Sequence, residues 1–209
     1  MIIDTNTSCL GKAQVLKQKN VDTVGRYYRV ATHPEWAITP AEARELSAAG
    51  IRIFTVFEEH GSKSALPLTQ QQGKADGAKA LHQATAIGQP AGSTIYFAVE
   101  GLPGGYKSAD LPGIRDYFSG IAEAIGGQYA LGVYGDGIVC KTLLDEDVCR
   151  HTWLAAASTS FAGTKTFMRS WRWSLAQMGP LDITTDGLSV DIDVANGEFG
   201  AFFVAPLVG

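Results

Sequence analysis

Short apolar, β-branched runs that alternate with helical patterns dominate this chain. Eight such runs lie at residues 1–4, 21–30, 51–57, 94–100, 129–134, 153–157, 174–178 and 188–193. Strands that alternate with helices are typical of a parallel sheet covered by helices. No linker, low-complexity stretch or charge run divides the sequence, so we expect a single domain over residues 1–209.

The number of runs bears on the type of sheet. Eight units in 209 residues leave roughly 26 residues per unit, the lean end of a (β/α)8 barrel. We therefore predict an α/β fold: a single, compact TIM-type (β/α)8 barrel whose units need not all be regular. An open doubly wound sheet is the alternative. Its nucleotide-binding versions lose support because the sequence has neither G-x-G-x-x-G after the first run nor G-x-x-x-x-G-K-[ST].

The helical segments carry recognisable local signals. Thr39 stands before a proline and predicts the N-cap of a helix, with Glu42 three residues on to complete a capping box. A long helix is expected over residues 69–87. Gly73 and Gly77 each weaken that helix by roughly 1 kcal/mol relative to alanine.

Composition narrows the classes of function. A hydrophobic content of 45% with 18% charged residues is ordinary for a globular protein. The formal net charge of −4 provides no basic surface for nucleic acid, and no run approaches the roughly 18 apolar residues of a membrane span. We expect neither nucleic-acid binding nor membrane insertion. Cys9, Cys140 and Cys149 are widely spaced without a C-x-x-C pair, which favours free buried thiols.

The run over residues 94–100 ends abruptly in Glu100 and is followed by glycines and a proline. On a pleated strand its residues alternate between a wholly apolar face, which needs cover, and a second face that carries Tyr96, Ala98 and Glu100. Open and closed α/β proteins place their chemistry at the carboxyl ends of such strands. Glu100 is therefore a candidate site residue.

Three other runs end in carboxylates: the first in Asp4, the third in Glu58 and Glu59, and the last in Asp191 and Asp193. In a closed parallel barrel all these ends lie on one face. The first strand pairs with the last, which places Asp4 and Asp191 about 5 Å apart. Asp191 and Asp193 share a strand face, whereas Glu58 and Glu59 point opposite ways. Only one of those two glutamates can line the mouth, and the sequence leaves open which.

A ring of carboxylates can do two kinds of chemistry. It can divide into a protonated acid and ionised partners for glycoside hydrolysis, or it can bind a divalent metal. No histidine accompanies the strand-end acids, which counts against a zinc site, and we expect neither a metal nor another cofactor. Tyr134, Trp153 and Gln177 lie at or near the ends of later strands and are candidates for stacking against a sugar and hydrogen-bonding it.

Several motifs, taken in order, resemble those of a known family. They are Ile3-Asp4-Thr5, Gly25-Arg26-Tyr27-Tyr28-Arg29, Ile95-Tyr96-Phe97-Ala98-Val99-Glu100, Gly132-Val133-Tyr134-Gly135 and Val190-Asp191-Ile192-Asp193-Val194-Ala195. Together they look like the glycoside-hydrolase-like domain known as DUF1906, which is related to the glycoside hydrolase family 25 lysozymes. The resemblance covers essentially the whole chain. It implies a TIM-type barrel with its site at the carboxyl ends of the strands, and action on the glycan of bacterial peptidoglycan.

The resemblance also suggests roles for single residues. Glu100 resembles the general acid of the lysozyme D-x-E motif, Asp4 the acid after the first strand, and Asp191 the acid of a V-D-x-N-like final strand. We expect these three to be catalytic in a muramidase-type glycosidase. The expected substrate-binding residues are Glu58, Tyr134, Trp153, Gln177 and Asp193. Because Ala98 replaces the first acid of D-x-E, a non-catalytic carbohydrate-binding barrel is the alternative.

The amino terminus bears on where the protein acts. Met-Ile-Ile-Asp lacks the basic region, apolar stretch and cleavage site of a secretion signal. By analogy with phage lysins and antibacterial effectors, we expect a protein made in the cytoplasm that acts at the bacterial cell wall after lysis or specialised secretion. An effector of this kind would have an immunity or secretion partner, which the sequence does not identify.

Overall fold

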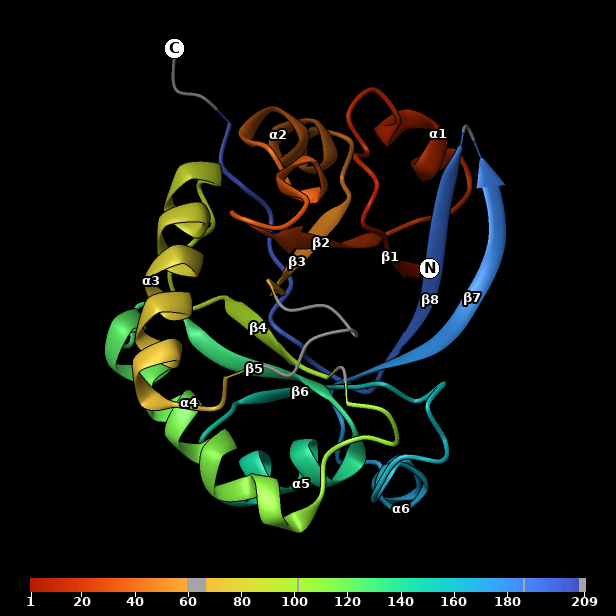
Figure 1. Cartoon of the computed structure of the whole chain (residues 1–209). Coiled ribbons are helices and arrows are strands. Elements are labelled where there is room, and N and C mark those ends of the chain that lie inside the picture. Colours follow the sequence, from red (N-terminus) through yellow and green to blue (C-terminus); the bar gives the residue numbers. More distant parts are fainter. Residues whose placement is uncertain (60–66, 101, 186, 207–209) are drawn as a thin grey trace.

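A computed structural model describes residues 1–59, 67–100, 102–185 and 187–206 of the chain. Eight strands close into a barrel in which each strand pairs with its neighbours along the chain and β1 pairs with β8 (Figure 1). The strands are β1 (Ile2–Asp4), β2 (Thr23–Tyr28), β3 (Arg52–Phe57), β4 (Thr94–Val99), β5 (Ala130–Gly135), β6 (His151–Leu154), β7 (Leu175–Thr185) and β8 (Leu188–Ala195). The prediction of a TIM-type α/β barrel is confirmed.

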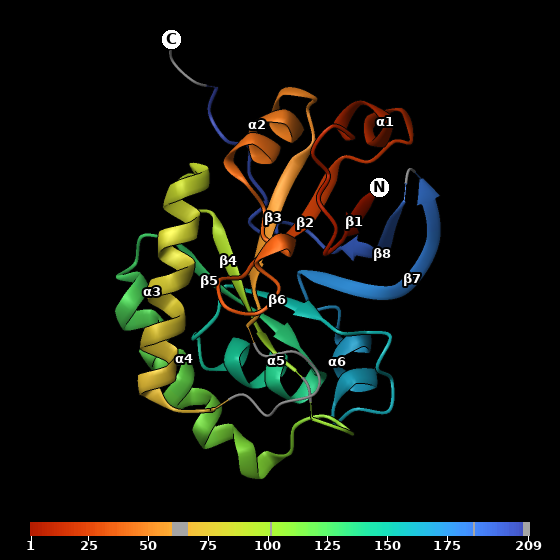
Figure 2. The same ribbon diagram turned by 45° about the horizontal axis from the view of Figure 1, so that its top comes forward.

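Helices surround most of the barrel (Figure 2). They are α1 (Ala13–Gln18), α2 (Pro40–Ala48), α3 (Gln70–Ile87), α4 (Leu111–Ile125), α5 (Gly137–Asp145), α6 (Thr164–Ser170) and two 3-10 turns, η1 (Pro34–Trp36) and η2 (Ser108–Asp110). In the described parts of the chain, no helix combines the length and the hydropathy needed to cross a membrane. Cys9, Cys140 and Cys149 are buried and free, as predicted.

The last strand departs from the predicted parallel arrangement. Strands β1 to β7 are parallel to one another, but β8 runs antiparallel to both β7 and β1. The prediction that all strand-end acids share the carboxyl end of a parallel strand is therefore wrong for Asp191 and Asp193. Only two residues separate β7 from β8, and a parallel crossover needs a dozen or more. The antiparallel register still places Asp191 opposite Asp4, so the predicted pairing of these two acids is confirmed.

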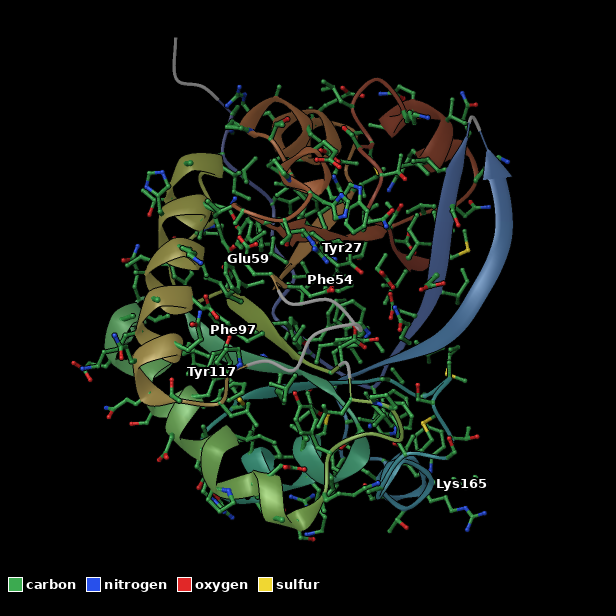
Figure 3. All side chains as sticks on the ribbon, viewed as in Figure 1. Tyr27, Phe54, Glu59, Phe97, Tyr117 and Lys165 are labelled. Carbon is green, nitrogen blue, oxygen red and sulfur yellow. The ribbon has the colours of Figure 1, made fainter. Side chains whose placement is uncertain are left out.

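The two faces of β4 divide as the alternation predicts. The inward side chain Tyr96 packs inside the barrel with Phe54 and Trp153. The Tyr96 hydroxyl donates to the carbonyl of Phe199 at 2.8 Å, which ties the C-terminal segment to the barrel interior. Figure 3 shows Phe54 within the barrel and Phe97 on the side of α3 and α4. The outward residues of β4 pack in the core between sheet and helices: Ile95, Phe97 and Val99.

Glycines allow α3 and α4 to pack closely. A Cβ atom on Gly73 would lie 1.9 Å from the carbonyl oxygen of Tyr117, and one on Gly120 would lie 2.0 Å from that of Gln70. Neither position tolerates a side chain without movement of the backbone. From the sequence we expected Gly73 only to weaken the helix. The close packing of α3 against α4 in fact requires a glycine at this position.

Replacing Gly120 with alanine is expected to lower the free energy of unfolding by about 1–3 kcal/mol, because the added methyl group must push α3 and α4 apart. Chemical denaturation followed by circular dichroism measures this. The control is Ser119→Ala on the exposed face of the same helix, which should change stability by less than about 0.5 kcal/mol. Equal stability of the two variants would contradict the close packing.

Candidate functional site

Two adjoining cavities lie at the mouth of the barrel. The larger, of about 200 Å³, is lined by Asn6, Tyr27, Arg29, Trp36, Glu58, Glu100, Tyr134, Gln177 and Asp191. The smaller, of about 110 Å³, is lined by Asp4, Thr5, Asn6, Tyr27, Ser189, Val190 and Asp191. Because they share Asn6, Tyr27 and Asp191, we treat them as one surface and call it the acidic groove.

Two glutamates and an arginine form the centre of the acidic groove. The Arg29 guanidinium donates to Glu58 Oε1 at 2.7 Å. Burial, reinforced by the charge of Glu100 and opposed by Arg29, raises the pKa of Glu58 to about 7. Burial also raises the pKa of Glu100, opposed by the nearby Tyr134 hydroxyl and by the charge of Arg29.

Two buried carboxyl groups that repel each other titrate as a pair. Burial disfavours the ionised form of both groups, and the charge of Glu100 further disfavours ionisation of Glu58. When Glu100 carries the proton, the repulsion on Glu58 disappears and the hydrogen bond from Arg29 favours ionised Glu58. The pair can thus present one acid and one carboxylate at the same time.

Gln177 holds the neighbouring acids in place. Its Nε2 donates to Asp4 Oδ2 at 2.8 Å and to Asp191 Oδ2 at 3.2 Å, while its Oε1 accepts from the Tyr134 hydroxyl at 2.7 Å. The Tyr27 hydroxyl donates to the other oxygen of Asp4 at 3.3 Å. These contacts fix the Gln177 amide in one orientation and connect Tyr134, on β5, with the acids of β1 and β8.

A second carboxyl pair joins Asp4, which lines the acidic groove, to Asp193, which does not. Burial raises the pKa of Asp4 to about 7, and burial with the charge of Asp4 raises the pKa of Asp193 well above its usual range. Trp153 Nε1 donates to Asp193 Oδ1 at 2.8 Å. The second oxygen of Asp193, Oδ2, is buried and has no hydrogen-bond partner among the described residues. Ionising both acids would bury two like charges side by side, which disfavours the doubly ionised pair.

The structure brings most of the predicted site residues to one place. Those that line the acidic groove are Asp4, Glu58, Glu100, Tyr134, Gln177 and Asp191. Asp193 and Trp153 do not line it. Trp153 is 1% exposed inside the barrel and packs against the Tyr134 ring with centroids 4.4 Å apart. The expectation that Trp153 stacks against a sugar fails here, because the strand alternation turns its ring inward, where it supports Tyr134 instead.

The loop that follows β2 binds Glu59 and so determines that Glu58 is the glutamate that lines the groove. Glu58 faces the acidic groove. Glu59 turns the other way, and its carboxylate accepts from the backbone N–H groups of residues 30–32, at 2.9 Å for Ala31 and 3.0 Å for Thr32. Figure 3 labels Glu59 beside this loop, which leads to η1 and Trp36. Glu59 therefore anchors one wall of the site.

Replacing Glu59 with glutamine is expected to lower the free energy of unfolding by about 1–3 kcal/mol at pH 7. Burial alone would raise the pKa of Glu59, but the hydrogen bonds from the loop outweigh it and leave the pKa lowered. The ionised group therefore stabilises the fold above the usual value of 4.5, and this contribution is lost as the pH falls through the folded pKa. Denaturant unfolding at a series of pH values should show the difference between parent and variant shrinking below pH 4.5. The control is Glu35→Gln on the same loop, where the side chain is exposed; a similar loss there would contradict the anchoring role.

Sequence analysis did not identify Asn6, Tyr27, Arg29 or Trp36 as site residues. The Arg29 guanidinium lies 4.7 Å from the centre of the Trp36 ring and 5.7 Å from that of Tyr27. Strand alternation contained a usable signal, since Tyr27 and Arg29 follow Gly25 on the inward face of β2. Trp36 had no such signal, because it lies on a loop whose position depends on tertiary contacts. Across the described ranges, no three or more His, Cys, Asp or Glu side chains are grouped so as to hold a metal ion.

Two solved structures share this fold. The Tat-secreted protein Rv2525c of Mycobacterium tuberculosis, in complex with L-tartrate, superposes with a TM-score of 0.79 at 18% identity, over 96% of this chain and 97% of that one. The modular autolysin LytC of Streptococcus pneumoniae, in complex with a synthetic peptidoglycan ligand, gives a TM-score of 0.60 at 15% identity, over 92% of this chain and 45% of that one. At these identities the likeness concerns the fold.

Sequence comparison gives the family. The uncharacterised protein YbfG of Bacillus subtilis (strain 168) is 29% identical over 211 residues; the match covers 93% of this chain, which spans only 28% of the length of YbfG. The model of the Rv2525c-like, glycoside hydrolase-like domain matches residues 14–185, from α1 to the end of β7. The barrel, the strand-end acids and this match agree with the predicted resemblance. The chain belongs to the Rv2525c-like glycoside hydrolase-like domain family, also known as DUF1906.

Proposed function

We propose that this domain is a glycosidase of the muramidase type that cleaves the glycan of bacterial peptidoglycan. The observation that carries the proposal is the pairing of Glu100 with the Glu58–Arg29 ion pair in the acidic groove. Glycoside hydrolysis needs one protonated and one ionised carboxyl group, and this pair can divide in that way because the charge of Glu100 opposes ionisation of Glu58. The peptidoglycan ligand bound by LytC, which shares the fold, supports a glycan as the substrate class.

Each group has a role in this proposal. Protonated Glu100 donates to the leaving glycosidic oxygen. Glu58, when ionised and held by Arg29, compensates the positive charge that develops on the sugar ring. Asp191 orients the substrate, and Asp4 supports it through Gln177. The aromatic rings that line the acidic groove, Tyr27, Trp36 and Tyr134, provide apolar surface for the sugar faces.

Incubation of the purified protein with bacterial peptidoglycan tests the proposal. Mass spectrometry of the soluble fraction should detect glycan fragments with new reducing ends. Absence of such fragments across peptidoglycans of several chemotypes would overturn it. We also propose the bacterial cell wall as the place of action, which detection of the protein in wall fractions of the producing or a target cell would test.

Ala98 favours a second candidate, a carbohydrate-binding barrel without catalysis. It occupies the inward face of β4 two residues before Glu100, so this strand supplies only one carboxyl group to the acidic groove. Under this reading the parent protein binds glycan without cleaving it. Binding would persist in Glu100→Gln and be lost in Tyr134→Ala, since Tyr134 lines the groove. Cleavage by the parent would exclude this candidate.

A further inference from the structure

The acidic groove has an uneven balance of charge. Five carboxyl groups line it or pair with one of its acids, against one guanidinium group: Asp4, Glu58, Glu100, Asp191 and Asp193 against Arg29. Arg29 already donates to Glu58, so its charge is committed within the protein. The acids of the groove therefore outnumber the cations available to pair with them.

Asp191 is the carboxyl group that belongs to both cavities of the acidic groove. Its side chain is only half-buried and lines both cavities of the acidic groove. Gln177 donates to one of its oxygens at 3.2 Å. In the ranges that the structure describes, no lysine or arginine nitrogen lies within the 4.0 Å of an ion pair with Asp191. Asp191 thus lines the groove without a protein cation among the described residues.

The walls beside Asp191 suit a small cation. Tyr27 lines both cavities together with Asp191, and an aromatic ring is a favourable neighbour for a cation. Asn6 and Ser189, which line the smaller cavity next to Asp191, add oxygen atoms able to accept hydrogen bonds. An ammonium group has three N–H donors and no acceptor, and it matches a carboxylate flanked by neutral oxygens and an aromatic ring.

We propose that the acidic groove selects amino sugars with a free ammonium group, which binds at Asp191 beside Tyr27. The inference rests on the proposed function and names its substrate as a glycan in which hexosamine residues lack the N-acetyl group. An N-acetylated residue brings a neutral amide that leaves the charge of Asp191 uncompensated. An acidic sugar would face the carboxyl groups of the groove and find its only guanidinium, that of Arg29, already bound to Glu58. A neutral hydroxyl can hydrogen-bond Asp191, but it gains nothing from the excess charge.

The test uses two oligosaccharides that differ only in acetylation, β-1,4-linked hexamers of glucosamine and of N-acetylglucosamine. Calorimetric titration at pH 6, where the amine is protonated, is carried out with Glu100→Gln so that no turnover disturbs the measurement. The glucosamine hexamer should bind about tenfold more tightly. Asp191→Asn in the same background should abolish the preference. The matched control, Asp116→Asn on the exposed face of α4, removes the same charge outside the groove and should preserve it.

The outcomes separate this inference from the proposed function. Equal or tighter binding of the N-acetylated hexamer, or no binding of either, overturns the inference even where the parent cleaves peptidoglycan. A preference that survives Asp191→Asn also overturns it, because general attraction to an acidic protein would then explain the binding. A preference that disappears only in Asp191→Asn supports the inference, even if the parent cleaves no glycan and the proposed hydrolysis fails.

Discussion

Glu100→Gln should lower kcat for glycan cleavage by about 10³-fold or more, with little change in KM and an intact fold. Glutamine preserves the shape and hydrogen-bonding reach of the side chain, but its amide cannot deliver a proton to the leaving oxygen. Glu100 takes part in no ion pair among the described residues, and burial disfavours its charge, so the variant should be at least as stable as the parent. Rates from reducing-end release and a thermal unfolding curve measure both properties. Full activity in this variant would disprove the assignment of Glu100 as the acid.

The pH profile distinguishes an acid from a residue that merely shapes the groove. Burial raises the pKa of Glu100, so the protonated form that the reaction needs persists toward neutral pH and the rate falls as the pH rises through that pKa. Glu58→Gln removes a neighbouring negative charge and leaves Arg29 unpaired, and both changes lower the pKa of Glu100. The alkaline limb of the remaining activity should therefore move to lower pH. A limb that stays in place would contradict the coupling of these two glutamates.

Arg26→Met should cost about 3–5 kcal/mol of stability, which is the largest structural effect we anticipate. The Arg26 Nε donates to Glu42 Oε1 at 2.6 Å, and neither side chain is exposed to solvent. Arg26 also donates to the backbone carbonyls of Thr5 and Trp36. Removing it leaves a buried carboxylate without its cation and loosens the loops on which Thr5 and Trp36 lie. Glycan binding should weaken together with stability.

Two controls sharpen this prediction. Arg115→Met breaks an ion pair of the same length, 2.6 Å to Glu146, but both side chains are exposed, and the loss should stay below about 1 kcal/mol. The double variant Arg26→Met with Glu42→Met removes both buried charges and should recover part of the stability. Denaturant unfolding compares all three variants. A loss in Arg26→Met no greater than that in Arg115→Met would show that burial does not determine the cost.

Local features of the fold were predictable because they depend on residues close together in the sequence. The alternation of residues 94–100 correctly assigned the inner and outer faces of β4. Thr39 is the N-cap of α2, and its hydroxyl accepts from the backbone N–H of Glu42 at 3.2 Å. The second half of the predicted capping box is wrong. The Glu42 carboxylate binds Arg26 instead, because a buried guanidinium from another element attracts it more strongly than a neighbouring N–H group.

The acid ring was predictable in outline. Recurring acids at strand ends, together with closure of a barrel, correctly placed Asp4 opposite Asp191. The reversal of β8 was not foreseen, since the run at 174–178 gave no sign that β7 continues to Thr185 and leaves no room for a crossover. The burial of Trp153 was missed for a related reason. We predicted from its position on the strand that Trp153 lies at the mouth of the barrel. The tilt and closure of the barrel instead place its side chain in the interior.

Residue types and their periodicity predicted an α/β barrel and the candidate acids, and the resemblance to DUF1906 added a glycan as the expected substrate. Tertiary structure selected Glu58 rather than Glu59, brought Arg29 and Trp36 to the acidic groove, and buried the carboxyl groups close to one another. Strand and helix patterns come from interactions within a few residues, which a linear sequence displays directly. A pKa depends on burial and on charges supplied by strands far apart in the chain, and those distances exist only once the barrel has closed.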